Sequence, residues 1–151
     1  MADGRTDTFE VGLAAIRRRE RSTAELKDWL LERDHELEDV DAAVERLLEC
    51  GELDDERFAR LYAQDKRELS GWGPARIAAV LRERGIDRDL IELACADPYE
   101  AQLERAVALL RARRTPLEGD TALERALGML ARRGYGSEVA YEAIRIAAPP
   151  G

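Results

Sequence analysis

Three segments of the sequence align without gaps, and this repetition constrains the fold more than any other feature. They read AELKDWLLERDH (24–35), ARIAAVLRERGI (75–86) and ERALGMLARRGY (124–135). Within the alignment a leucine, an arginine and a bulky packing residue recur at the same positions. A diverged repeat of about 50 residues predicts similar modules that stack along an axis.

The segment GELDDERFARLYAQD raises the question of whether two adjacent acids start a helix or perform chemistry. With Asp54 as the N-cap, Leu53 and Phe58 form the apolar pair that often brackets a helix start, and Asp55 lies in the first turn, where the helix dipole favours negative charge. A catalytic carboxylate pair would need a base, a nucleophile or a metal set beside it. The single histidine, His35, lies outside this segment, so we interpret both acids as helix-starting residues.

Other helix starts have similar signatures. The tetrapeptides STAE and TALE, beginning at Ser22 and Thr121, match the capping box. The dipeptide DP places Asp97 as a cap before proline's favoured first position, and Gly73 precedes a proline in the same way. With Gly85 as a stop, these signals predict helices over 54–69, 73–84 and 87–95, and repeats over 8–52, 53–96 and 97–147. The sequence therefore predicts an all-α fold of about nine helices in tandem three-helix repeats, forming an elongated, curved stack.

Charge is distributed unevenly along the chain. The net charge is −8; residues 1–50 hold 8 Lys/Arg and 14 Asp/Glu, whereas residues 101–151 hold 8 and 6. An acidic chain is a poor generic nucleic-acid binder, because neutralisation of phosphates drives that affinity. The RRRER segment at 17–21 lies in the acidic part, and we expect its neighbours to offset it. The arginines of the last third form either a solvated face or the contact with an anionic partner; they are Arg111, Arg113, Arg114, Arg132 and Arg133.

Cysteine usage and hydropathy exclude several classes of protein. Cys50 and Cys95 match no zinc-binding spacing, and we expect both to be small buried residues. The sequence has no secretory signal and no apolar run of the ~18–20 residues that span a bilayer. We therefore expect a cytoplasmic protein with no catalytic residue, metal site or cofactor, and with neither a membrane nor a small molecule as its partner.

The stretch from Leu47 to Ile86 resembles the RecX family, the small bacterial regulators of the RecA recombinase. The shared pattern is a glycine, a hydrophobic residue and two aspartates, then Phe-Ala-x-x-Tyr, then a Gly-Pro segment that ends in Gly-Ile. Its residues here are Gly51, Leu53, Asp54, Asp55, Phe58, Ala59, Tyr62, Gly73, Arg76, Ile77, Leu81, Gly85 and Ile86. The resemblance is most specific in this stretch and is collinear over nearly the whole chain.

The resemblance implies a non-enzymatic regulator of DNA repair, homologous recombination and the SOS response. Family members bind in the groove of the RecA filament on single-stranded DNA and usually inhibit its activities, and some also bind DNA weakly. We interpret the motif residues as architectural and expect the chain to be a monomer, because each repeat has neighbours that cover its apolar face. The alternative is a stand-alone helical module that binds nucleic acid.

Overall fold

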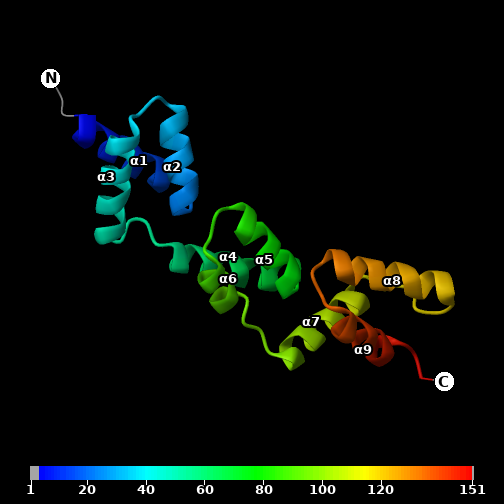
Figure 1. The fold of residues 1–151 in the computed structure, drawn as a ribbon. Helices are drawn as coiled ribbons and strands as arrows, with labels where there is room; N and C mark the ends of the chain where they lie inside the picture. The colour runs from blue at the N-terminus through cyan, green and yellow to red at the C-terminus, as the bar shows by residue number, and fades with distance from the viewer. Residues whose placement is uncertain (1–3, 151) are drawn as a thin grey trace. The chain divides into compact units, whose positions relative to one another are not determined.

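The chain is all-helical in the part that the structure describes. The structure is a computed structural model and describes residues 4–150, where it contains nine helices and no strand (Figure 1). The helices are α1 (Gly4–Arg18), α2 (Thr23–Glu32), α3 (Leu37–Glu49), α4 (Asp55–Ser70), α5 (Pro74–Glu83), α6 (Arg88–Ala94), α7 (Tyr99–Ala112), α8 (Asp120–Arg132) and α9 (Ser137–Ala147). The predicted all-α class is confirmed, whereas the curvature of a stack and the exact repeat boundaries stay predictions.

The helices belong to two compact units, and the division between them passes through α4 and α5. One unit contains the chain up to Leu61 together with Leu81–Ala94, and the other contains Tyr62–Val80 and the chain from Cys95 onward. Each unit therefore contains part of α4 and of α5. We describe the two units separately.

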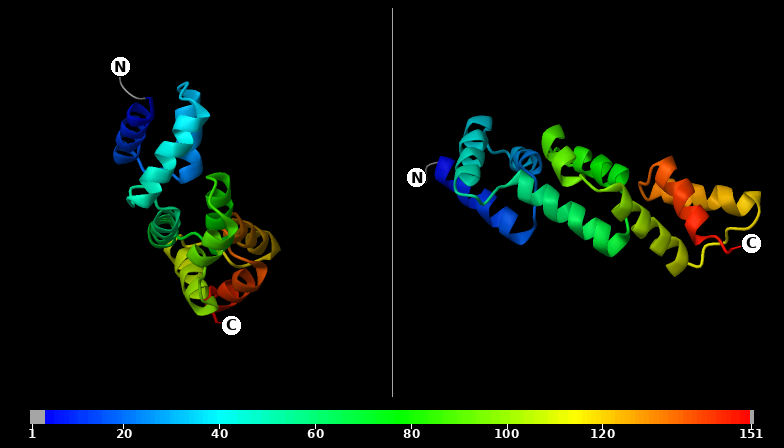
Figure 2. Two further views of the ribbon diagram at one scale, coloured as in Figure 1. Left: turned by 60° about the vertical axis from the view of Figure 1, so that its left-hand side comes forward. Right: turned by 90° about the horizontal axis from the view of Figure 1, so that it is seen from below.

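The first unit is built around the packing of α1, α2 and α3 on one another. Its core is apolar and consists of Ala15, Leu26, Leu30, Val40, Val44, Leu47 and Leu53. The second unit has the corresponding arrangement, with α9 packed against both α7 and α8 (Figure 2). Its core consists of Ala106, Val107, Leu110, Ala126, Leu130, Tyr135, Val139, Ala140, Ala143 and Ile144. The helical periodicity of the apolar residues produces one buried face on each helix.

Two predicted helix starts have the expected cap geometry. The Asp54 carboxylate accepts a hydrogen bond from the Arg57 backbone N–H at 3.0 Å, and Leu53 and Phe58 are both buried. At the start of α2 the capping box between Ser22 and Glu25 is present. Both signals are local in sequence, which explains why they could be recognised without a structure.

Two other cap predictions are wrong. The N-cap of α8 is Gly119, whose φ of 93° lets the chain enter the helix at Asp120, so Thr121 lies within the first turn and no side chain caps the helix. The N-cap of α7 is Pro98 and not Asp97. The Asp97 carboxylate is only 5% exposed and forms an ion pair with Arg105. The carboxylate therefore bonds a side chain of α7 itself.

The expected burial of the two cysteines is also wrong. Cys50 is exposed and Cys95 is half-buried. Cys50 is the C-cap of α3 and lies beyond the buried stripe that ends at Leu47. Its Sγ lies 3.5 Å from the Leu47 carbonyl oxygen, so the residue completes a helix end and does not fill the core.

The helix that contains each aligned segment ends in the same left-handed turn; these helices are α2, α5 and α8. The residues Asp34, Gly85 and Gly134 occupy equivalent positions and have φ values of 66°, 80° and 99°. The residue after each turn donates its backbone N–H to the carbonyl of the aligned leucine, as in Tyr135 to Leu130 at 3.0 Å. This is the hydrogen bond of a Schellman-type helix end, so the sequence repeat is also a structural repeat.

Two glycines of the first unit allow the packing role of this turn to be measured. Gly85 and Gly51 have nearly equal φ values of +80° and +78°, but a Cβ on Gly85 would lie 2.5 Å from the Ala24 Cβ, whereas a Cβ on Gly51 would meet nothing within 4 Å. We expect Gly51→Ala to lower the free energy of unfolding by about 1–2 kcal/mol through backbone strain alone. Gly85→Ala should lower it by a further ~1–3 kcal/mol through the clash.

Urea unfolding of the two variants and of the double variant Gly85→Ala/Ala24→Gly tests this prediction. Removing the Ala24 methyl should recover part of the loss caused by Gly85→Ala, giving a favourable coupling between the two positions. Equal destabilisation by Gly51→Ala and Gly85→Ala, with no coupling to Ala24, would show that the close approach is unimportant.

Candidate functional site

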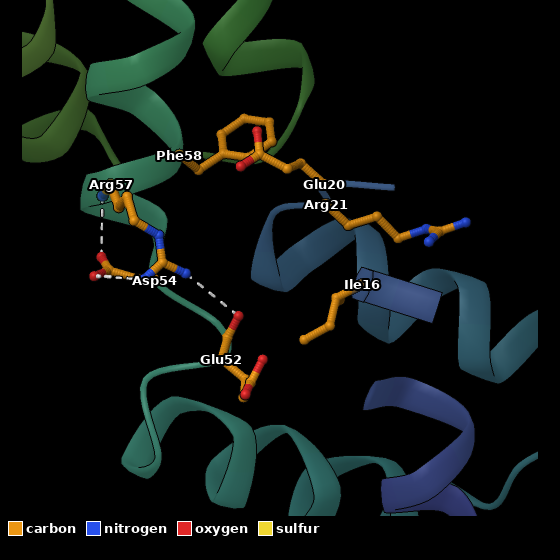
Figure 3. Close-up of a pocket in the computed structure, with 7 residues that line it drawn as sticks. All are labelled: Ile16, Glu20, Arg21, Glu52, Asp54, Arg57 and Phe58. Atoms are coloured by element: carbon orange, nitrogen blue, oxygen red, sulfur yellow. Dashed lines mark hydrogen bonds and ion pairs between the residues drawn. The ribbon is translucent and has the colours of Figure 1, made fainter. Parts of the chain in front are cut away.

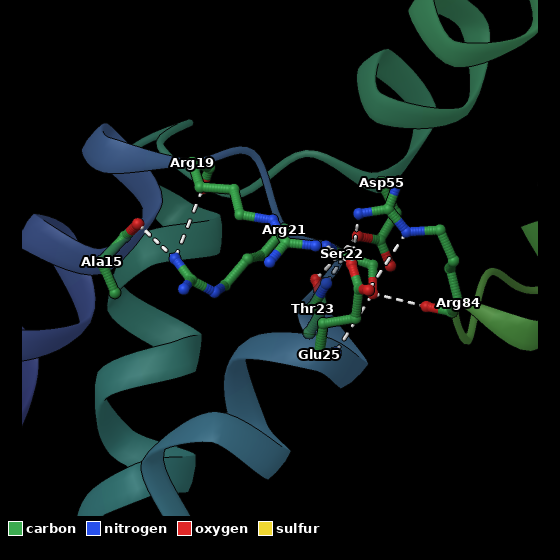
Figure 4. Close-up of polar contacts among 8 residues, drawn as sticks. All are labelled: Ala15, Arg19, Arg21, Ser22, Thr23, Glu25, Asp55 and Arg84. Atoms are coloured by element: carbon green, nitrogen blue, oxygen red, sulfur yellow. Dashed lines mark hydrogen bonds and ion pairs between the residues drawn. The ribbon is translucent and has the colours of Figure 1, made fainter.

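The first repeat junction is a polar cluster between the start of α2 and the end of α5 (Figure 4). The Arg84 guanidinium donates to both carboxylate oxygens of Glu25, at 3.1 and 3.0 Å. The Ser22 hydroxyl donates to the Arg84 carbonyl oxygen at 2.6 Å. A bidentate, charge-assisted pair fixes orientation as well as distance, so the capping box of α2 also holds the following repeat.

Asp55 has a role that the sequence did not reveal. Its carboxylate accepts hydrogen bonds from the Thr23 backbone N–H at 2.8 Å and from the Thr23 hydroxyl at 3.0 Å. Asp55 therefore satisfies an unpaired N–H in the first turn of α2 as well as lying in the first turn of α4. The two adjacent acids are architectural in this structure: Asp54 caps its own helix, and Asp55 contacts another.

The second junction lies within the second unit and uses the backbone more than side chains. The Gly73 N–H donates to the Arg133 carbonyl at 2.7 Å, and the Ala75 N–H donates to the Gly134 carbonyl at 3.1 Å. The Tyr135 hydroxyl donates to the Gly71 carbonyl at 2.7 Å. A Cβ on Gly73 would lie 2.5 Å from the Gly134 carbonyl oxygen, so only glycine permits this approach.

Aligned arginines explain how one junction resembles the other. Arg84 bonds Glu25 of the preceding aligned segment, and Arg133 donates to the Ser70 carbonyl at 2.8 Å. Arg33, at the same position of the first segment, has its guanidinium 3.7 Å from the centre of the Trp29 ring. The same sequence position therefore links repeats in two segments and covers an aromatic ring in the other.

The remaining motif residues lie in the core or at helix ends. Phe58, Ala59, Ile77 and Leu81 are buried, and the Tyr62 ring meets the Trp72 ring edge-on with centroids 6.5 Å apart. Trp72 also lies near the cations Lys66 and Arg76, and its expected packing on Ile77 stays a prediction. These positions agree with an architectural interpretation of the motif.

The arginines of the last third do not form one uniform surface. Arg111, Arg113, Arg114 and Arg132 are exposed. Arg133 is half-buried, and its guanidinium is bonded in the second junction. Replacement of Arg133 would therefore disturb the packing of the second unit.

A second group of arginines lies in the first unit and was underestimated from the sequence. Burial and the positive charges of Arg19, Arg18 and Arg33 together lower the pKa of Arg21, and only Glu25 opposes them. Arg33 comes from the end of α2, so the RRRER segment gains a basic neighbour across the fold. Acidic neighbours offset this segment at Arg17, which pairs with Glu52 at 3.2 Å, and the expectation stays a prediction for the other arginines of the segment.

A small cavity of about 160 Å³ lies beside this region and is lined by residues of opposite charge (Figure 3). Its lining residues are Ile16, Glu20, Arg21, Glu52, Asp54, Arg57 and Phe58. Asp54 is engaged by Arg57 at the helix cap. No cluster of three or more potential metal ligands occurs among the described residues, and none of their helices is long and apolar enough to cross a membrane. The cavity offers no nucleophile with an adjacent base.

Comparison with known proteins identifies the family. Residues 9–47 match the first three-helix domain of RecX, and residues 54–94 match its second three-helix domain. The chain belongs to the RecX family. It is 39% identical to the regulatory protein RecX of Mycolicibacterium smegmatis over 85% of this chain and 72% of that protein. It is 34% identical to the RecX of Thermobifida fusca over 88% of this chain and 74% of that one.

Solved RecX structures have the same fold. The crystal structure of RecX from Lactobacillus salivarius superimposes with a TM-score of 0.87 at 20% identity, covering 97% of this chain and 98% of that chain. A second crystal structure of regulatory protein RecX gives a TM-score of 0.82 at 25% identity, covering 95% of this chain and 72% of that chain. The recognition made from the Leu47–Ile86 motif is confirmed.

The Glu25–Arg84 pair makes the stability of this RecX protein depend on pH. Burial tends to raise the pKa of Glu25, but hydrogen bonds from Arg84 and the Ser22 backbone outweigh burial, so the folded pKa lies below its ordinary value of 4.5. The stabilising contribution is therefore complete above the ordinary pKa and is lost as the pH falls through the lowered one. We expect Glu25→Gln to lower the free energy of unfolding by about 1 kcal/mol at neutral pH.

Chemical unfolding at neutral pH and near pH ~3 measures this effect, and the difference between wild type and Glu25→Gln should shrink at the lower pH. Glu142→Gln is the matched control, because Glu142 pairs with Arg145 on an exposed surface and such pairs contribute little. A pH-independent loss in Glu25→Gln would contradict the role given to this ion pair.

Proposed function

We propose that the chain regulates the RecA recombinase by binding the RecA filament on single-stranded DNA, and that it acts as an inhibitor. Membership in the RecX family carries this proposal, since the curated relatives are named regulatory proteins. The geometry supports it, because the described residues offer charged surfaces and no constellation suited to catalysis. We accordingly propose a protein without catalytic activity or cofactor that acts in the bacterial cytoplasm, in DNA repair and recombination.

The charge distribution supports a particular set of contacts. The first 50 residues carry 8 basic and 14 acidic side chains, and only the last third has an excess of basic ones. We infer that acidic surface of the first two repeats faces basic recombinase surface, while exposed arginines at the end of α7 lie nearest the DNA. Of the candidate contacts, Arg111, Arg113, Arg114 and Arg132 are exposed and retain this proposed role.

The ends of the repeat array favour a monomer. At the inner junction Gly85 lies against Ala24, where a Cβ would not fit. In the repeat alignment, Asp34 of the first segment corresponds to Gly85, and Glu124 of the third segment corresponds to Ala24. Both residues are larger than those at the junction, and both are acidic. Because a further copy cannot dock through the same close approach, we expect no head-to-tail assembly.

The DNA-dependent ATPase rate of the cognate recombinase tests the proposed inhibition. We expect the rate to fall when the protein is added well below one molecule per recombinase, because a regulator bound at a few filament sites blocks growth or drives disassembly. No change at a saturating dose would contradict inhibition. Binding to DNA without recombinase, falling steeply with added salt, would favour the stand-alone nucleic-acid module.

Charge reversal tests the proposed arginine contacts. Arg111→Glu/Arg113→Glu should weaken binding to the recombinase–DNA filament by about tenfold, since like charge would then face the phosphates. Arg88→Glu is the control, because the Arg88 side chain is 90% exposed and pairs with Glu92 one helical turn away. Filament pull-down with both folded variants gives the comparison, and equal affinity for the two would show that the end of α7 is not a contact.

A further inference from the structure

A compact basic surface in the first repeat has no role in the proposed contacts. It consists of Arg21 and Arg33, whose guanidinium groups lie over the half-buried Trp29, together with the exposed Arg18 and Arg19 that come just before Arg21 in the chain; we call it the Trp29 cluster. From its geometry we propose that the Trp29 cluster is a docking site for a short acidic segment of a partner protein. The proposal rests on residues of the first unit alone and does not require the recombinase to be the partner.

Two guanidinium groups of the Trp29 cluster are held in place before any ligand arrives. The Arg33 guanidinium lies 3.7 Å from the centre of the Trp29 ring and donates to the Trp29 carbonyl at 3.3 Å. The Arg21 guanidinium lies 5.0 Å from the same ring centre and donates to the Ala15 carbonyl. Such stacking fixes the planar fork, so less conformational entropy is lost when an anion binds to its remaining N–H groups.

The positive charges of the Trp29 cluster are poorly compensated within the chain. Among the described side chains, no carboxylate forms an ion pair with any of its arginines. The Glu25 carboxylate is held by Arg84 (Figure 4). Mutual repulsion of the guanidinium groups is therefore relieved when an external anion binds.

The surroundings favour a short acidic segment over a nucleic acid. A polynucleotide carries a charge at every nucleotide and extends beyond a compact patch, and here it would run onto the first 50 residues of the chain, which carry 14 acidic side chains. A base stacking on Trp29 would also have to displace Arg33 from the ring. An acidic peptide presents its carboxylates only at the patch, and arginine forks bind carboxylates through two parallel hydrogen bonds.

A binding titration with an isolated peptide tests the proposal. The protein has two tryptophans, Trp29 and Trp72, so Trp72→Phe leaves Trp29 as the single fluorescent reporter. The probe is a short polyglutamate peptide, with a polyglutamine peptide of equal length and a single-stranded oligonucleotide of equal charge as comparisons. Arg18→Glu/Arg19→Glu reverses two exposed charges of the cluster, and Arg82→Glu/Arg88→Glu reverses two exposed charges elsewhere in the same unit.

We expect polyglutamate to change Trp29 fluorescence saturably and polyglutamine to have no effect. Arg18→Glu/Arg19→Glu should weaken polyglutamate binding by about tenfold, and the control pair should change it less than about twofold. Absence of polyglutamate binding, or an equal loss in the two variants, overturns the proposal. Tighter binding of the oligonucleotide that is lost in Arg18→Glu/Arg19→Glu overturns it in favour of a nucleic-acid site. A circular dichroism spectrum of each variant verifies that it is folded.

Discussion

The contact on which the architecture depends is the seating of one glycine turn against the first turn of a helix in the preceding repeat. In the first unit Gly85 approaches Ala24, and in the second unit Gly134 approaches Arg76 so closely that a Cβ on it would lie 2.5 Å from the Arg76 backbone nitrogen. Backbone hydrogen bonds then join the repeats in the second unit, whereas side chains of Ser22 and Glu25 join them in the first. Among the glycines of the family motif, Gly85 is therefore required both by packing between repeats and by its positive φ, whereas Gly73 is required by packing and Gly51 by its positive φ.

The sequence predicts those features that depend on residues close together in the chain. The cap by Asp54, the capping box of Ser22 and the end of α5 at Gly85 are set within a few residues, and the local signals for them are strong. The partner of Asp55 lies 32 residues away, and the carboxylate of Asp97 is taken by an arginine on α7. The pairing of Asp97 with a side chain two turns into α7 is not indicated by the local cap signal, and α7 begins one residue later than that signal predicts.

The composition of a segment does not predict which of its arginines are available for binding. Arg133 belongs to an arginine-rich segment, yet its guanidinium holds the second junction. Arg21 belongs to a segment with acidic neighbours, yet its strongest charged neighbours are arginines. The spacing of Trp29 and Arg33 by one helical turn is the one signal in the sequence that could have revealed the stacked cluster. In this RecX protein the helices position the side chains, and we expect function at the charged surfaces that these side chains form.

Co-sedimentation with the recombinase filament tests the central claim that these surfaces recognise an assembled filament. The account predicts saturable sedimentation of the protein with recombinase assembled on single-stranded DNA, and little with the same DNA alone at the same salt concentration. Equal sedimentation with bare DNA, or none with the filament, would contradict the account. The first of these results would identify a nucleic-acid binder, and the second would leave this member of the RecX family with a different partner.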